Sequence, residues 1–256
     1  KGLVSFYRTT FEDCDIGFNN ATFDEGSISF NHSDFGESCI SFGGTKFGNG
    51  AVSFYGATFG GSLVSFDSAT FGDGPVNFVG AAFGACSVAF EGEISRKGGI
   101  NFNHIDLEKG SLTFDALKFG ENHISFKNAK VNGNLELQCY ENTEFIRGLS
   151  FHGVRLTGTF YLEGDFACVP DLRSTALSAH LDLENLRIEA SPHELKSPKD
   201  DKYASGDPNI ARLRWLKKLA EQSRHHEAAL HFFAMERRVA RHTKAKSPGA
   251  AVLDYL

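Results

Sequence analysis

Residues 52–71 read VSFYGATFGGSLVSFDSATF and place phenylalanine at positions 54, 59, 66 and 71. The intervals alternate between five and seven residues, and the same alternation extends over most of the chain. It defines a 12-residue unit that begins at Val4. The first position of the unit is Val, Ile or Leu, and the third is Phe in eleven consecutive units from Phe6 to Phe126. A period this strict predicts a repeat architecture.

Each unit carries two pairs of residues separated by two positions, such as Val52 with Phe54 and Ala57 with Phe59. Alternate residues of a β-strand face the same side, whereas an amphipathic helix would repeat every 3.6 residues. Each unit therefore predicts two short strands whose paired residues point inward. The predicted core ladder comprises Phe6, Phe18, Phe30, Phe42, Phe54, Phe66, Phe78, Phe90, Phe102, Phe114 and Phe126 at position 3, and Phe11, Phe23, Phe35, Phe47, Phe59, Phe71 and Phe83 at position 8.

These strands predict a parallel β-solenoid in which like residues stack coil over coil and each coil contacts only its neighbours. Either one 12-residue unit or two such units could form a coil. We favour a 24-residue coil, because four sides with four inward Phe side chains fill the interior better than a flat 12-residue coil. Gly and Asn at the ends of the strands are expected to supply turns that need a positive φ. The recurrent glycines lie at positions 9 and 11 and include Gly48, Gly50, Gly60, Gly72 and Gly74.

The spacing loosens after Val131, where Leu replaces Phe in segments such as LSFHGVRLTGTFYL. We expect the coils to continue, with insertions near residues 139–147 and 164–170, and to end near Glu189. The predicted organisation is a solenoid of 12-residue units over 1–189, a polar linker over 190–206, and a helical hairpin with a tail over 207–256.

The hairpin begins with Asp207 as an N-cap and Pro208 at the first helical position. The predicted buried stripe of its first helix is Ile210, Leu213, Leu216, Leu219 and Ala220. The apolar side predicted for the second helix is Leu230, Phe233 and Ala234. An open solenoid end exposes unpaired backbone groups, so we expect the hairpin to cover that end.

The net charge of −6 is divided unevenly along the chain. Residues 209–256 contain ten Lys and Arg against four Asp and Glu, a local charge of +6, which leaves −12 for residues 1–208. No run of 18 apolar residues and no signal-peptide pattern is present. The chain starts with Lys and the repeat is already running at Val4, so we expect it to be a fragment of a longer protein.

The five cysteines at positions 14, 39, 86, 139 and 168 are widely spaced and form no C-x-x-C pair. We expect reduced thiols in a cytosolic protein. His225, His226 and His231 lack the spacing of an H-E-x-x-H metal site, so we expect a solvated helix surface there. His32 and His104 share one repeat position and are expected to point outward. With no nucleophile motif or phosphate loop, the sequence predicts a non-catalytic protein without a cofactor or metal.

The stretches VSFYG and ATFGG resemble those of pentapeptide-repeat proteins. In that family the central Leu or Phe of each five, and a small residue two before it, point inward. Here Phe54 and Phe59 match the central residue, and Val52 and Ala57 the residue two before. The resemblance extends over the predicted solenoid, positions 1–189, and implies a right-handed, four-sided β-helix. The chain departs from the family pattern because every second side carries two extra residues.

The segment LRWLKKLAEQSRHHEAALHFFAMERR resembles the helical hairpin that follows the repeats in bacterial pentapeptide-repeat membrane proteins, where a transmembrane region comes next. The basic stretch ERRVARHTKAK has two interpretations. Its cations either complement the macrodipole at a helix C-terminus or form a membrane-proximal, positive-inside site. The residues concerned are Arg237, Arg238, Arg241, Lys244 and Lys246.

Three functional hypotheses remain open. The first is a scaffold that binds protein partners and is the soluble part of a larger membrane-associated bacterial protein, in the cytoplasm or at the cytoplasmic face of the inner membrane. The second, which the family resemblance allows, is a DNA mimic that acts on a type II topoisomerase. The third is a solenoid that self-assembles into homo-oligomers. Direct nucleic-acid binding is not expected, because the solenoid is acidic.

Overall fold

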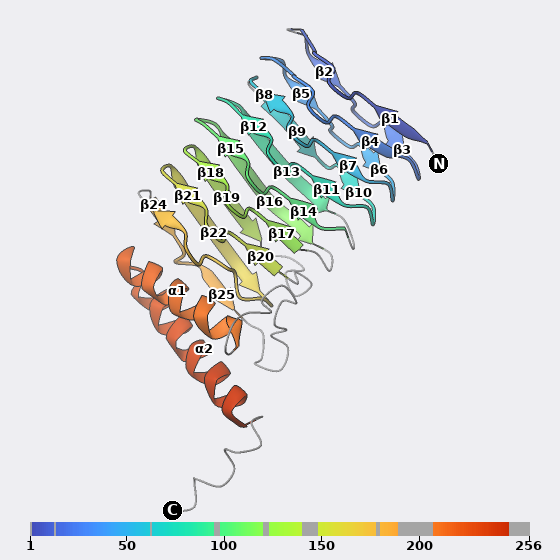
Figure 1. Cartoon of the computed structure of the whole chain (residues 1–256). Helices are drawn as coiled ribbons and strands as arrows, with labels where there is room; N and C mark the ends of the chain where they lie inside the picture. Colours follow the sequence, from blue (N-terminus) through green and yellow to red (C-terminus); the bar gives the residue numbers. More distant parts are fainter. Residues whose placement is uncertain are drawn as a thin grey trace, which may run out of the picture.

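The computed structural model describes residues 2–12, 14–61, 63–94, 98–119, 123–139, 148–177, 180–188 and 207–245. The chain winds into a parallel β-solenoid, with the N terminus at one end and two helices at the other (Figure 1). Val4 pairs with Ile28, Ile28 with Val52 and Val52 with Val76. This register shows that each coil contains two of the 12-residue units, as predicted.

Four parallel sheets form the sides of the solenoid, which confirms the four-sided cross-section. Sheet A contains β1 (Leu3–Ser5), β4 (Ser27–Ser29), β7 (Val52–Ser53), β11 (Val76–Asn77), β14 (Ile100–Asn101), β17 (His123–Ser125) and β20 (Gly148–Ser150). Sheet B contains β8 (Thr58–Phe59), β12 (Ala82–Phe83), β15 (Asp106–Leu107), β18 (Lys130–Val131), β21 (Arg155–Leu156) and β23 (Ala176–Leu177). Sheet C contains β2 (Ile16–Gly17), β5 (Ile40–Ser41), β9 (Leu63–Asp67), β13 (Ser87–Ile94), β16 (Ser111–Phe119), β19 (Asn134–Cys139), β22 (Thr159–Phe166), β24 (His180–Asp182) and β25 (Leu186–Ile188). Sheet D contains β3 (Thr22–Phe23), β6 (Lys46–Phe47) and β10 (Thr70–Phe71).

The turns that separate the strands adopt a positive φ at position 5 of the unit. Asn20, His32 and Asn128 occupy this position with φ between 56° and 58°, and Gly56 occupies it with φ of 62°. Asn and Gly tolerate the left-handed region best. His32 and His104 are both exposed at these turns, so the expectation that they point outward is confirmed.

Most glycines at positions 9 and 11 do not form the predicted positive-φ turns; Gly36, at position 9 with φ of 56°, is an exception. A Cβ atom on Gly60 would lie 2.8 Å from the carbonyl oxygen of Gly36, and one on Gly72 would lie 2.5 Å from that of Gly48. Neither Gly60 nor Gly72 has a positive φ. These glycines are needed because the backbones of successive coils approach too closely for any side chain.

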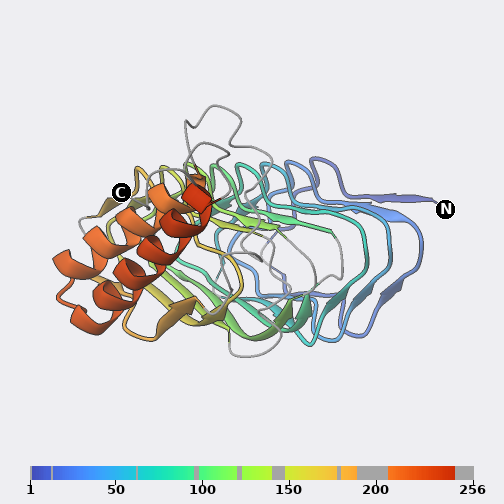
Figure 2. The same ribbon diagram turned by 90° about the horizontal axis from the view of Figure 1, so that it is seen from below.

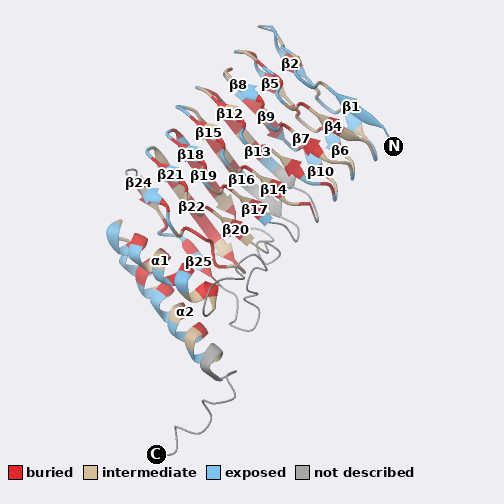
Figure 3. Ribbon diagram, viewed as in Figure 1, coloured by how far each residue is buried: buried red, intermediate tan, exposed pale blue. Residues whose placement is uncertain are grey.

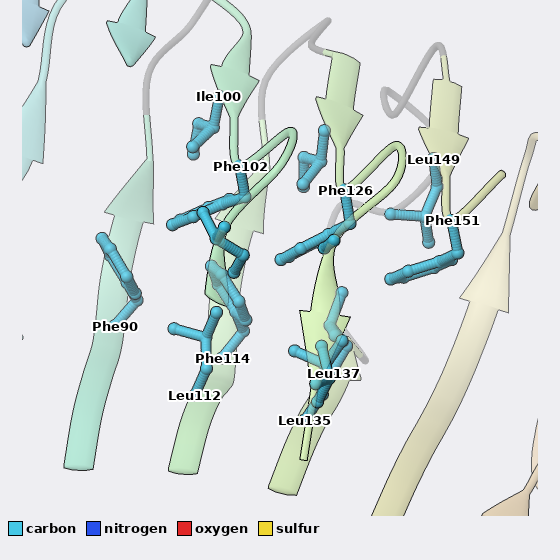
Figure 4. Close-up of a cluster of buried hydrophobic side chains, with 14 of the residues drawn as sticks. Phe90, Ile100, Phe102, Leu112, Phe114, Phe126, Leu135, Leu137, Leu149 and Phe151 are labelled. Atoms are coloured by element: carbon cyan, nitrogen blue, oxygen red, sulfur yellow. The ribbon is translucent and has the colours of Figure 1, made fainter. Parts of the chain in front are cut away.

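Phenylalanine rings form continuous stacks along the solenoid axis. In sheet A, Phe54 stacks on Phe78 with a centroid distance of 4.7 Å and an interplanar angle of 5°. In sheet C, Phe66 stacks on Phe90 at 4.6 Å and 1°. The two stacks meet edge to face across the core, as Phe54 and Phe66 do at 85°. These are the offset and edge-on geometries that aromatic pairs prefer, and Figure 4 shows them continuing to Phe126 and Phe151.

Burial of the ladder residues depends on the coil in which they lie. The ladder residues from Phe30 to Phe126 are buried, whereas those of the first coil, Phe6, Phe11, Phe18 and Phe23, are only partly buried (Figure 3). From β19 onward Leu fills the sheet C stack, where Leu137 and Leu162 follow Phe114 in register. The core therefore continues with aliphatic side chains after the Phe pattern lapses.

Two helices, α1 (Pro208–Gln222) and α2 (His226–Ala245), pack together across the C-terminal end of the solenoid (Figures 1 and 2). The side chain of Asp207 accepts a hydrogen bond from the Asn209 backbone N–H at 2.9 Å, so the predicted N-cap is confirmed. The predicted stripe of α1 is also buried, apart from the half-buried Ile210. The predicted linker, residues 190–206, lies outside the described residues.

The buried face of α2 differs from the prediction. Leu230, Phe233 and Ala234 are exposed, and the side chains that pack inward are Ala228, Ala229, Phe232, Met235 and Val239. Both sets follow a helical spacing, and Phe232 and Phe233 are adjacent in the sequence, so the local pattern fits either face. The contacts with α1 and β25 decide which face is buried.

Candidate functional site

The junction between the solenoid and the hairpin depends on two histidines. Nδ1 of His225 accepts a hydrogen bond from the Leu183 backbone N–H at 3.2 Å, and Nε2 of His231 accepts one from the Ile188 backbone N–H at 3.0 Å. In the body of the solenoid such N–H groups bond to the carbonyls of the next coil. The expectation of a solvated helix surface is therefore wrong for His225 and His231, which cap the last strands, while His226 is exposed.

A buried ion-pair cluster forms a second contact at this junction. Arg173 makes two hydrogen bonds to the carboxylate of Asp171, both at 2.8 Å, and Nη2 of Arg212 from α1 lies 3.4 Å from the same carboxylate. Burial alone would raise the pKa of Asp171, but the hydrogen bonds from Arg173 and the charge of Arg212 outweigh it and hold the pKa below its ordinary value. The carboxylate is thus charged, and it is bound both by Arg173 of the solenoid and by Arg212 of the hairpin.

Periodicity could not reveal this cluster, because neither Asp171 nor Arg212 repeats. One signal was present in the sequence: Arg212 lies beside Leu213 and Leu216 on the buried face of α1. A charged residue inside an apolar stripe implies a partner across the interface, since buried charges are paired. The sequence alone did not identify Asp171 as that partner.

The predicted basic site lies on the outer side of the hairpin. Arg237, Arg238 and Arg241 are exposed on α2. Lys244 belongs to the last turn of α2, but its side chain and all of Lys246 lie outside the described residues. The structure therefore places three of the five predicted cations at exposed positions of α2.

The outer face of sheet C carries a column of carboxylates. Asp67 on β9, Glu91 on β13 and Asp115 on β16 are in register on neighbouring strands and are all exposed. None of the ion pairs within the described residues involves them. Like charges placed directly opposite each other on a sheet repel one another and are destabilising. The three carboxylates nevertheless lie side by side, and they concentrate negative charge on this side of the solenoid.

The outer face of sheet A carries a column of uncharged Asn and Ser side chains. Asn77 and Asn101 are in register and accept hydrogen bonds from the backbone N–H groups of Val79 and Asn103, at 2.9 and 3.0 Å. With Ser53 and Ser125 they help to line a shallow groove of about 440 Å³. The faces of sheets A and C thus differ in charge although they share one backbone geometry.

Several titratable groups of the solenoid have raised pKa values. Burial raises the pKa of the Cys86 thiol to about 11 and also raises that of Cys139, so both thiols stay protonated at neutral pH. All five cysteines are free. The hydroxyl of Tyr161 donates a hydrogen bond to Glu163, which raises the pKa of Tyr161 to about 12.

The described residues offer no candidate for a metal centre or for a membrane-spanning helix. Within these ranges no three His, Cys, Asp or Glu side chains are grouped so that they could hold a metal ion. Neither of the two described helices is long and apolar enough to cross a bilayer. A scan against models of known protein families and a search of curated proteins give no match to this chain.

Proposed function

We propose that this chain is a non-catalytic scaffold whose solenoid presents rigid outer faces to protein partners. The observation that carries the proposal is the stacking of coils in a constant register around a core filled by side chains. Inward positions are used for packing, so outward positions form columns at the strand spacing of roughly 4.8 Å. A repeat protein of this kind uses its extended surface for binding.

The finer part of the proposal concerns the setting of the scaffold. The resemblance to bacterial pentapeptide-repeat membrane proteins supports a larger, membrane-associated protein of which this chain is the extramembrane part. The basic residues on α2 support the same assignment, because cations flank membrane segments on the cytoplasmic side. Fractionation of the full-length protein tests it: recovery only in the soluble fraction contradicts the membrane setting.

Site-specific photo-crosslinking in cells tests the scaffold itself. A crosslinking side chain is placed at an outward position on each side of the solenoid, one at a time, at Asn101, Asp106, Thr113 and Thr70. We expect one or two adjacent faces to yield the same discrete product and the remaining faces to yield none. Equal, non-specific products from all four faces would contradict a defined binding surface.

A second candidate function is favoured by the carboxylate column of sheet C. Regularly spaced negative charge could present the pattern of a nucleic-acid backbone to a type II topoisomerase, as the family resemblance implies. A supercoiling assay with purified gyrase tests this. Inhibition by the wild-type chain that disappears in Glu91→Lys, with Glu12→Lys as the matched control outside the column, would support it. An absence of inhibition would remove it.

A further inference from the structure

Two large apolar side chains are exposed on the outer face of the hairpin. The Leu230 residue is 69% exposed and Phe233 is 43% exposed, whereas the neighbouring Phe232 is fully buried. Leu230 and Phe233 are three residues apart on α2, so they lie on one side of the helix. This side points away from the solenoid, because the residues on the opposite side pack against α1 and β25.

Two cations lie close to the Phe233 ring. Nζ of Lys217, on α1, lies 4.9 Å from the centroid of the Phe233 ring, and the guanidinium of Arg237 lies 5.9 Å from it. Arg241 is exposed one turn beyond Arg237. We call Lys217, Leu230, Phe233, Arg237 and Arg241 the basic-apolar face.

Two carboxylates of the hairpin are paired with cations, whereas Glu227, three residues before Leu230, is exposed and forms no ion pair among the described residues. Glu236 accepts a hydrogen bond from Arg214 at 2.7 Å, and Glu221 lies 3.7 Å from Lys217 in an i, i+4 pair. The guanidinium groups of Arg237 and Arg241 form no ion pair among the described residues. The face thus combines positive charge with apolar area, which suits an anionic partner that also has an apolar layer.

The shape of the molecule favours a planar partner over a long anionic polymer. The hairpin lies flat across the end of the solenoid, so its outer face is an end of the described molecule (Figures 1 and 2). Among the described residues, a plane that touches this end meets the hairpin and leaves the coils standing away from it. A long anionic polymer such as duplex DNA presents phosphates but no apolar layer for Leu230 and Phe233, so it matches only the charged half of this face.

We propose that the basic-apolar face binds the surface of an anionic lipid bilayer. Lys217, Arg237 and Arg241 contact lipid phosphates, while Leu230 and Phe233 enter the boundary between headgroups and acyl chains. The inference deepens the membrane setting proposed above and rests on it. It assigns the contact to the hairpin itself and does not require a segment beyond Leu256.

Vesicle sedimentation tests the proposal with the purified 256-residue chain. Vesicles of phosphatidylcholine alone are compared with vesicles that also contain phosphatidylglycerol, at low and high salt. We expect binding only to the anionic vesicles, and weaker binding in high salt. The double variant Arg237→Gln/Arg241→Gln should bind about thirtyfold more weakly, since each surface cation contributes a factor of roughly five.

Matched variants separate the face from the overall charge. Lys127→Gln/Arg155→Gln removes the same charge from the solenoid and should leave vesicle binding unchanged. Leu230→Ser/Phe233→Ser keeps every charge and should weaken binding at least severalfold, because apolar insertion is lost. Circular dichroism confirms that each variant is folded.

Three results would overturn the proposal: equal binding to both kinds of vesicle, equal losses in the hairpin and solenoid charge variants, or binding to duplex DNA that exceeds binding to anionic vesicles. The membrane setting fails separately, in fractionation of the full-length protein. Membrane recovery of a full-length Arg237→Gln/Arg241→Gln variant, together with vesicle binding that is unaffected by these changes, would retain the setting and reject this face.

Discussion

The body of the solenoid and its C-terminal end satisfy the same requirement in different ways. In the body, backbone N–H groups bond to carbonyls of a neighbouring coil, as Phe54 N–H does to Asn77 O of the next coil at 2.7 Å. At the last described coil, His225 and His231 accept the bonds from Leu183 and Ile188 instead. The body repeats one solution, whereas the end depends on individual residues.

The two regions also bury polar groups differently. Inside the coils, the few buried hydroxyls bond to a neighbouring coil, as Thr45 Oγ1 does by donating to Phe18 O at 2.7 Å. At the junction a charged cluster is buried, with Asp171 held between Arg173 and Arg212. Mutations should therefore have graded effects along the body and residue-specific effects at the end, and four pairs of variants test this difference.

The largest effect is expected inside the body. Phe54→Ala removes a fully buried ring that stacks on Phe30 and Phe78 and should lower the free energy of unfolding by about 3–5 kcal/mol. Phe11→Ala, in the partly buried first coil, should cost roughly 1–2 kcal/mol. Urea unfolding measures both. Equal losses would contradict a graded contribution along the axis.

The next effect is expected at the junction and depends on pH. Asp171→Asn removes the carboxylate charge that lies 3.4 Å from the buried Arg212 and should cost about 3 kcal/mol at neutral pH. Because folding lowers the pKa of Asp171, its stabilising contribution is complete above the ordinary carboxyl pKa and is lost as the pH falls through the lowered value.

The stability gap between the wild type and Asp171→Asn should therefore narrow below roughly pH 4. Thermal unfolding tests this expectation when it is measured from about pH 3, where most carboxyl groups are protonated, to about pH 7, where they are charged. Asp165→Asn, on the solenoid outside the cluster, is the control and should show no comparable gap at neutral pH. A gap that stays constant would show that Asp171 acts through packing and not through its charge.

A smaller effect is expected where coils approach closely. Gly72→Ala places a methyl group 2.5 Å from the Gly48 carbonyl oxygen and should cost about 1–3 kcal/mol through overpacking. Gly17→Ala meets only the Asn19 side chain at 3.5 Å and should be nearly neutral. Chemical denaturation of the pair measures the difference. A neutral Gly72→Ala would show that the coils can separate without loss.

The smallest effect is expected at a single cap. His231→Phe keeps an aromatic ring but leaves the Ile188 N–H without its acceptor, which should cost about 1–2 kcal/mol. His226→Phe, at an exposed position, is the control and should change stability very little. Hydrogen exchange at the Ile188 amide gives a local readout. Unchanged protection there would show that His231 does not hold the last strand.

The sequence predicts the parts of the molecule that repeat. The Phe intervals of five and seven define the coil, its four sides and its inward residues, and the strand register confirms two units per coil. The recurrence of Asn, Gly and His at position 5 is also a signal for the left-handed turn, whereas most of the glycines at positions 9 and 11 do not have a positive φ. Their close contacts with the preceding coil are visible only when the coils are assembled.

The sequence does not specify the non-repeating contacts. The spacing of α2 allows either Phe232 or Phe233 to be buried, and only the packing against α1 and β25 selects Phe232. That choice exposes Phe233 and Leu230 and creates the basic-apolar face. Lys217 and Arg237 lie on different helices and meet around Phe233 only when the hairpin is formed.

The sequence by itself therefore determined the solenoid. A residue type that recurs at a fixed interval packs against the equivalent residue of the neighbouring coil, and the alternation of residues along each strand specifies whether a side chain points inward or outward. Only the tertiary structure decided how the last coil is capped, which carboxylate binds Arg212 and which face of α2 is exposed. Those features join residues such as Asp171 and Arg212 or Ile188 and His231, which are about forty residues apart. No repeating interval relates them, so their contacts depend on the docking of the hairpin onto the finished solenoid.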